Sequence, residues 1–259
     1  MATGFGWCGK VEEAESLAKA GYDFIELPLS SFQLENKEAY EKHMASALAS
    51  ALPVKAFNLF FPGEVRIVGP EVDESRVRNY IALAAQTMAR LNAGIVVLGS
   101  AGARHIPEGW EQARAREQFL RVLSWCADEM KGTGAAVAIE PLNRGESNFI
   151  NSVAEGAALA REINRPEVRV LADFYHMAVE HEPLETMRDH REWLAHIHLA
   201  DTDRYYPGSG SYDYETFVGI LQEIDYQGLV SVECIVKPED KEADMQRAKA
   251  FIDRQWRLS

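Results

Sequence analysis

The chain has 259 residues, 47% of them hydrophobic, so it is long enough to bury one large core or two small ones. Its 40 acidic and 27 basic residues give a net charge of −13, which disfavours nucleic acids and anionic membranes as partners. The start, Met1–Phe5, lacks the basic and apolar segments of a signal peptide, and no apolar run approaches about 18 residues, so we expect a cytoplasmic protein that acts on a small molecule.

Short apolar runs and helical stretches alternate along the chain. The apolar runs predict eight buried strands, at Phe5–Cys8, Phe24–Leu27, Val54–Leu59, Ile95–Leu98, Ala136–Glu140, Val168–Asp173, Leu194–Leu199 and Leu229–Glu233. The stretches between them predict eight helices, at Val11–Ala20, Glu38–Ser50, Asp73–Leu91, Trp110–Lys131, Ser152–Ile163, Leu184–Arg191, Tyr214–Ile224 and Asp240–Trp256. This alternation indicates parallel strands joined by right-handed crossovers.

Eight strands and eight helices in about 250 residues are typical of a (β/α)8 TIM barrel, which commonly forms one domain. We therefore predict an α/β protein with a single TIM barrel over residues 1–259. An open, doubly wound sheet is the competing architecture. Such a sheet often carries a G-x-G-x-x-G motif after its first strand. Gly4, Gly6 and Gly9 do not have that spacing, which favours the barrel.

Four predicted strands in the second half of the chain end at residue types that bind metal ions. These residues are Glu140, Asp173, His198 and Glu233. In a parallel barrel the C-terminal strand ends meet at one mouth, where active sites are built. Each carboxylate alone would more often cap a helix or face solvent. The four together predict a site for one divalent cation.

The ligand types indicate both the metal and the chemistry. Three carboxylates and one imidazole suit manganese, magnesium or cobalt better than a metal selected by thiolates. Such an ion is a Lewis acid that would polarise a sugar carbonyl, so that glutamates on opposite faces exchange the acidified proton. His196 shares a strand face with His198, and that pair alone would be two hydrogen-bonded interior histidines.

Several segments of the second half resemble a known family. They are Ile139–Glu146 (IEPLNRGE), Asp173–Met177 (DFYHM), His196–Arg204 (HIHLADTDR) with Pro207–Gly210 (PGSG), and Val232–Glu233. These segments look like the xylose isomerase-like TIM barrel superfamily of sugar phosphate isomerases and epimerases, nearest to the D-tagatose and D-psicose (allulose) ketose 3-epimerases. The resemblance is specific over residues 139–233 and weaker before them.

The resemblance implies roles for individual residues. One divalent metal ion, usually manganese or cobalt, would be bound by Glu140, Asp173, His198 and Glu233. The two glutamates of this set would also be the catalytic acid/base pair. The residues that would hold substrate oxygens are Glu146, His176 and Arg204. For Arg204 the alternative is a surface salt bridge. The family further suggests a homodimer or homotetramer.

The first half of the chain offers less specific candidates. Glu26, near the end of the second strand, either faces the pocket or is a structural acid of the barrel mouth. Trp7 either covers the sugar or is buried without touching it. After the fourth strand, Gly99–His105 replaces the aromatic-rich loop expected over an unphosphorylated ketohexose. Arg104 in this loop would receive a phosphate or carboxylate of the substrate, or belong to a flexible lid.

We expect a metal-dependent ketose 3-epimerase with Mn²⁺ as its ion and Co²⁺ or Mg²⁺ as alternatives. Glu233 would remove the proton at C3, and Glu140 would return it to the other face of an enediolate. The alternatives are a hydroxypyruvate-type aldose–ketose isomerase, a keto-sugar lyase or dehydratase, and a non-catalytic sugar or metal binder. A nuclease of the apurinic-endonuclease type shares the barrel but needs further histidines and aspartates, whereas the ends of the third and fourth strands offer Asn58 and Gly99.

Overall fold

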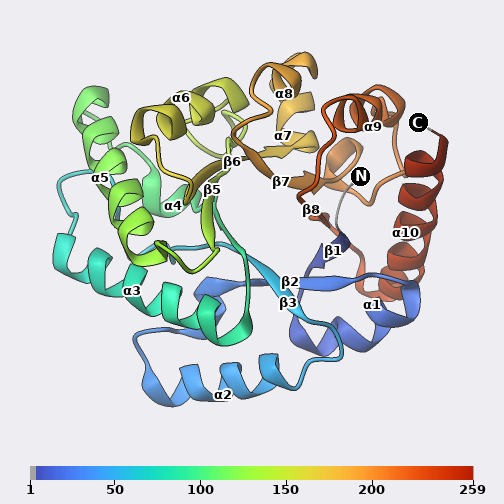
Figure 1. The fold of residues 1–259 in the computed structure, drawn as a ribbon, viewed down its shortest axis with the longest axis horizontal. Coiled ribbons are helices and arrows are strands. Elements are labelled where there is room, and N and C mark those ends of the chain that lie inside the picture. Colours follow the sequence, from blue (N-terminus) through green and yellow to red (C-terminus); the bar gives the residue numbers. More distant parts are fainter. Residues whose placement is uncertain (1–3, 259) are drawn as a thin grey trace.

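Eight short apolar segments form parallel strands that close into a barrel in chain order, with β8 pairing back to β1 (Figure 1). The computed structural model describes residues 4–258. The strands are β1 (Gly4–Cys8), β2 (Phe24–Pro28), β3 (Val54–Asn58), β4 (Ile95–Leu98), β5 (Ala136–Ile139), β6 (Val168–Asp173), β7 (Leu194–Leu199) and β8 (Leu229–Val232). The predicted (β/α)8 barrel is confirmed. That residues 1–259 form one domain stays a prediction, because residues 1–3 and 259 lie outside the described part.

The helices surround the ring of strands (Figure 1). They are α1 (Ala14–Ala20), α2 (Lys37–Leu48), α3 (Glu74–Leu91), α4 (Ala101–Arg104), α5 (Gln112–Met130), α6 (Val153–Ile163), α7 (Phe174–Val179), α8 (Glu185–Asp189), α9 (Tyr214–Glu223) and α10 (Lys241–Leu258). Short 3-10 turns lie at η1 (Val11–Glu13), η2 (Leu29–Phe32), η3 (Thr202–Arg204) and η4 (Pro238–Asp240). The prediction missed α4 and α7, whose 4 and 6 residues are too few to display a helical period. Among residues 4–258, no helix combines the length and apolar character needed to cross a membrane.

Polar side chains fix several helix ends. At the start of α6 the Ser152 hydroxyl accepts the amide hydrogen of Glu155 at 3.1 Å, and at the start of α9 the Asp213 carboxylate accepts that of Thr216 at 3.0 Å. Gly21 ends α1 with φ of 90°, a left-handed conformation that glycine adopts without strain. These caps stop the helices at the loops that return the chain to the barrel.

Alternating side chains along each strand create two separate apolar cores, one on each side of the barrel wall. Strand residues on the outer side pack against the helices, as Ile25 and Phe57 do. The inner core contains Phe24, Ala56, Ile95, Val97, Ala136, Ala138 and Leu171. Four of these inner residues are followed two positions later by a polar residue, namely Glu26, Asn58, Glu140 and Asp173. The same alternation therefore directs these polar side chains inward at the C-terminal mouth.

Candidate active site

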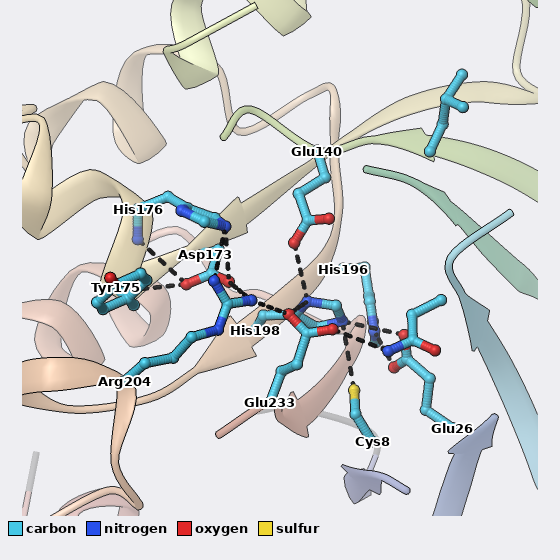
Figure 2. Close-up of polar contacts among 12 residues, drawn as sticks. Cys8, Glu26, Glu140, Asp173, Tyr175, His176, His196, His198, Arg204 and Glu233 are labelled. Atoms are coloured by element: carbon cyan, nitrogen blue, oxygen red, sulfur yellow. Dashed lines mark hydrogen bonds and ion pairs between the residues drawn. The ribbon is translucent and has the colours of Figure 1, made fainter. Parts of the chain in front are cut away.

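The four predicted metal ligands come together at the mouth of the barrel (Figure 2). Glu140 and Glu233 directly follow β5 and β8, Asp173 ends β6, and His198 is the penultimate residue of β7. One ligand atom from each of the four lies within 4.8 Å of all the others. Three of the residues are buried and Glu233 is half-buried, so the cluster lies mostly out of water.

The ligand atoms of this cluster face one another at short distances. His198 Nδ1 lies 3.1 Å from Glu140 Oε1 and 3.4 Å from Glu233 Oε2, and the two glutamates reach it from opposite sides in Figure 2. Asp173 Oδ1 accepts the amide hydrogen of Tyr175 at 2.8 Å, whereas its Oδ2 is buried and has no hydrogen-bond partner within residues 4–258. A buried carboxylate oxygen without a donor is costly. The donor set and this orphaned oxygen fit a divalent metal ion.

A fourth acid, Glu26 of β2, lies behind the cluster and is fully buried. Its two oxygens lie 2.7 Å from His196 Nε2 and 3.0 Å from His198 Nε2. This contact leaves Nδ1 of His198 facing the other ligands, as carboxylates behind metal-binding histidines commonly do. Burial alone would lower the pKa of His198, but Glu26 and further acidic groups raise it well above the ordinary value. The field that favours a proton on this imidazole also favours a metal cation.

The two glutamates of the cluster differ in charge preference. Burial and the nearby Glu233 raise the pKa of Glu140. Burial also opposes ionisation of Glu233, but His198, Arg204 and the amide of Asn58 outweigh it and hold the pKa of Glu233 below its ordinary value. The pKa values of the two carboxyl groups are therefore shifted in opposite directions, which is the pattern of an acid and a base.

The sequence analysis gave no role to two residues that contact the ligands. Asn58, at the end of β3, donates a hydrogen bond from Nδ2 to Glu233 Oε1 at 2.8 Å. Cys8, at the end of β1, places its sulfur 3.8 Å from His198 Nε2. Strand alternation carries the signal that would have found both, because each stands two positions after an inward residue, Ala56 or Gly6.

His176, expected to contact substrate, lies beside the cluster. Its Nδ1 accepts a hydrogen bond from the backbone amide of Asn143 at 3.3 Å and lies 2.9 Å from Asn143 Nδ2. Its Nε2 lies 3.3 Å from Arg204 Nη1, and a guanidinium can only donate, so both ring nitrogens face donors. Asn143, which had no assigned role, thus orients the His176 ring beside Arg204.

Arg204 points into the site and is not a surface salt bridge. Its Nη2 lies 2.6 Å from Glu233 Oε2, its Nη1 lies 3.2 Å from Glu146 Oε1, and its guanidinium carbon lies 5.0 Å from the centroid of the Tyr175 ring. Its side chain is 20% exposed. The structure thus brings Glu146 and Arg204 together with the metal-type cluster, as Figure 2 shows for the arginine.

The loop that carries Arg204 is held in an unusual backbone conformation. Asp203 and Arg204 have φ of 59° and 61°, in the left-handed region that costs non-glycine residues energy. The buried carboxylate of Asp201 stabilises the loop, because it accepts the backbone amide hydrogens of Gly208 at 2.9 Å and Tyr212 at 3.2 Å. The strained backbone conformation is therefore found at the residues that direct the Arg204 guanidinium toward the site.

Trp7 does not cover the site. It is 2% exposed, belongs to the outer core and packs edge-on against Tyr22, with ring centroids 5.6 Å apart. Its neighbours Gly6 and Cys8 face the barrel interior, so alternation turns Trp7 toward the helices. The side chain is buried on the helix side of the barrel wall, against the expectation of a sugar contact and in line with the alternative of burial.

Arg104 also differs from both of its expected roles. The side chain is fully buried, with Nη1 donating to the carbonyl of Leu98 at 2.9 Å and Nη2 to the carbonyl of Glu140 at 2.7 Å. Burial lowers the pKa of Arg104 to about 10, so the group stays charged at neutral pH. The turn of α4 folds the loop back onto the barrel. Arg104 is thus neither a receptor for a substrate anion nor part of a solvated lid.

Fold and site together define a TIM barrel with a divalent-metal type of ligand set at its mouth. The model of the family described as "Xylose isomerase-like TIM barrel" matches residues 14–255, and the chain belongs to this family. The family expected from the sequence is therefore confirmed.

Three known proteins illustrate the similarity. The chain is 38% identical over 122 residues to 3-dehydro-D-guloside 4-epimerase of Escherichia coli K12, an alignment that covers 47% of this chain and 45% of that relative. It is 28% identical over 223 residues to ketose 3-epimerase of Arthrobacter globiformis, covering 83% and 74%. The solved D-psicose 3-epimerase of Clostridium cellulolyticum with D-tagatose has a TM-score of 0.84 at 18% identity, covering 97% and 98%, and this likeness concerns the fold alone.

Proposed function

We propose that the chain is a divalent-metal-dependent ketose 3-epimerase. The observation that carries the proposal is the cluster of three carboxylates and one imidazole at the barrel mouth, and a relative named ketose 3-epimerase supports the same class of enzyme. The residues that would hold the ion are Glu140, Asp173, His198 and Glu233. Mn²⁺ is the ion we propose, with Co²⁺ or Mg²⁺ as alternatives. When bound, the ion supplies Lewis acidity that makes a C–H bond beside a carbonyl easier to deprotonate.

Glu233 and Glu140 are the proposed base and acid. Glu233 takes the proton from C3 of the sugar, because Asn58 and Arg204 keep its carboxylate ionised. Glu140 returns a proton to the opposite face of the resulting enediolate, in keeping with the raised pKa of its carboxyl group. The configuration at C3 is inverted.

The substrate oxygens are held by the residues beside this pair. His176 presents its Nε2 to the sugar, since Asn143 occupies its Nδ1. Arg204 stabilises the oxygen that becomes anionic. Glu146 accepts from a sugar hydroxyl, and its contacts with Asn143 Nδ2 at 2.9 Å and Arg204 Nη1 at 3.2 Å already fix its carboxylate.

The deciding experiment is turnover in deuterated water. Mn²⁺-loaded protein is incubated with a panel of free and phosphorylated ketoses, and the products are separated by chromatography and analysed by NMR. We expect deuterium at C3 in both the product and the recovered substrate, because the donating carboxyl group exchanges its proton with solvent. Epimerised product without deuterium at C3 after many turnovers contradicts the two-base assignment. Label confined to C1 or C2 assigns the protein to the aldose–ketose isomerases, and loss of water assigns it to the dehydratases.

A second candidate is an epimerase that acts at C4 of a 3-keto sugar. The observation that favours it is the 38% identity to the relative named 3-dehydro-D-guloside 4-epimerase, although that alignment covers only 45% of the relative. The chemistry is the same, because a proton on C4 then lies beside the C3 carbonyl. Including a 3-keto glycoside in the panel separates the two candidates by the carbon that gains deuterium. A cytoplasmic location and a homodimer or homotetramer stay predictions.

A further inference from the structure

The loop after β4, which stood out in the sequence, folds back as α4 and surrounds Glu140. Arg104 donates to the carbonyl of Leu98 at the end of β4 and to the carbonyl of Glu140 at the end of β5, at 2.9 and 2.7 Å. The backbone amide of Glu140 donates to the same Leu98 carbonyl at 3.3 Å. The main chain of Glu140 is therefore held from both sides.

A buried guanidinium is an expensive way to join two strands. Arg104 is fully buried, and its Nε has no hydrogen-bond partner in the described part of the chain. Burying a charge without a paired carboxylate costs free energy, and an apolar side chain would fill the same space more cheaply. The planar fork of donors, however, reaches two carbonyl groups at once and fixes their relative position. An apolar residue cannot supply that constraint.

Gly99 supplies space on the other side of the same glutamate. A Cβ atom at this position would lie 1.9 Å from Glu140 Oε2 and 3.1 Å from Glu140 Cδ. The backbone of Gly99 is outside the left-handed region, so its conformation alone does not require glycine. What requires glycine is the carboxylate that rests against it.

We propose that Gly99 and Arg104 are positioning residues for Glu140. Arg104 fixes the main chain from which the carboxylate projects, and Gly99 provides the space that the carboxylate occupies. The inference rests on the proposed function, because it takes Glu140 to be a metal ligand and the proton donor. Neither residue contacts substrate in this scheme.

The test begins with Gly99→Ala, with Gly94→Ala as its matched control. Gly94 precedes the same strand, and a Cβ there meets no atom within 4 Å. The atom displaced by Gly99→Ala is the end of a flexible side chain, so the fold should tolerate the change and the melting temperature should stay near that of the wild type. Mn²⁺ affinity, measured by calorimetry without substrate, should fall about 10- to 100-fold, the range for residues that orient metal ligands. Gly94→Ala should change neither quantity.

A double-mutant comparison separates positioning from general structural support. In a Glu140→Ala background Gly99→Ala has no carboxylate to displace, so it should produce no further loss of Mn²⁺ affinity. Arg104→Lys keeps the charge but not the fork and should weaken Mn²⁺ binding in the same direction. Should Arg104→Lys fail to fold, Gly99→Ala decides the proposal on its own.

Two outcomes overturn the inference. One is wild-type Mn²⁺ affinity in Gly99→Ala, and the other is an equal loss of affinity in the presence and absence of the Glu140 carboxylate. Asp173→Asn, which removes a ligand charge without touching the loop, distinguishes this failure from failure of the proposed function. If Asp173→Asn weakens Mn²⁺ binding and Gly99→Ala does not, only the positioning role is lost. If neither variant has an effect, the metal site itself is refuted.

Discussion

The two halves of the barrel contribute to the site in different ways. The half from β5 to β8 supplies all four residues of the candidate metal cluster. The half from β1 to β4 supplies none of them. Its residues, however, contact three of the four candidate ligands. The pairs are Glu26 with His198, Asn58 with Glu233, and Arg104 with the main chain of Glu140. One half thus provides the candidate ligands, and the other half provides contacts that position three of them.

The placement of the four candidate ligands depends on contacts with other residues. Asp173 is held within its own half, by the amide hydrogens of Tyr175 and His176 at the start of α7. The other three ligands depend on contacts that cross the barrel or the β4–β5 pair. Variants in the β5–β8 half should therefore abolish turnover or ion binding. Variants in the β1–β4 half should weaken turnover and ion binding without abolishing either.

Removing the ion should have the largest effect of all. A chelator should abolish activity and lower the melting temperature, because an ion bound only by the folded state stabilises it by mass action, about 2.7 kcal/mol at a free concentration 100 times Kd. Mn²⁺ or Co²⁺ should restore both properties. The measurements are turnover and thermal denaturation before and after metal stripping, and full activity of stripped protein would contradict the proposed chemistry.

Within the ligand half, the two proton-transfer residues should be separable from a pure ligand. Glu140→Gln and Glu233→Gln should lower turnover at saturating Mn²⁺ by about 10²- to 10⁴-fold, the range for loss of a general acid or base. Asp173→Asn should mainly weaken Mn²⁺ affinity and recover turnover as the ion is added. Equal turnover of the three variants at saturating ion would refute the assignment of roles.

In the supporting half, Glu26→Gln should lower Mn²⁺ affinity about 10- to 100-fold, because the carboxylate behind His198 is lost. Glu167→Gln, which changes a buried acid paired with Arg165, is the matched control and should leave affinity unchanged. His198 and His196 hold the pKa of Glu26 well below its ordinary value despite burial. The stability it contributes is thus present above pH about 4.3 and is lost as the pH falls through the folded pKa. Denaturation of the metal-free wild type and variant across acidic pH should show their difference shrinking in that direction.

The smallest of these effects is expected for Asn58→Ala. The amide of Asn58 helps to keep the pKa of Glu233 low, so its loss should raise that pKa. A base with a higher pKa is protonated at higher pH, and the acidic limb of the kcat/KM profile should move upward by roughly one unit, as one hydrogen bond to a charged group allows. Activity on the alkaline side should be retained, and an acidic limb at the wild-type position would exclude this support.

The candidate ligands and their supporting contacts also differ in how well they can be predicted from the sequence. The strands and the clustering of the four candidate ligands were predictable because apolar runs, strand alternation and ligand chemistry are all local signals. The supporting contacts are not local: Glu26 and His198 are 172 residues apart, and Asn58 and Glu233 are 175 apart. The predictions for Arg104 assumed an accessible side chain, because arginine is almost never fully buried. Trp7 lies between the inward positions Gly6 and Cys8, so strand alternation was the signal that places it on the outer side of the wall.

Two seams join the halves, since β4 pairs with β5 and β8 pairs with β1. A fragment that contains only β5 to β8 would carry every candidate ligand and none of the three supports from the other half. Its ion affinity is expected to be weak, and adding the complementary fragment should restore affinity only when both seams close. Ion binding would then report fragment complementation directly, and the tightness of the bound ion would measure how faithfully two separately made half-barrels reassemble.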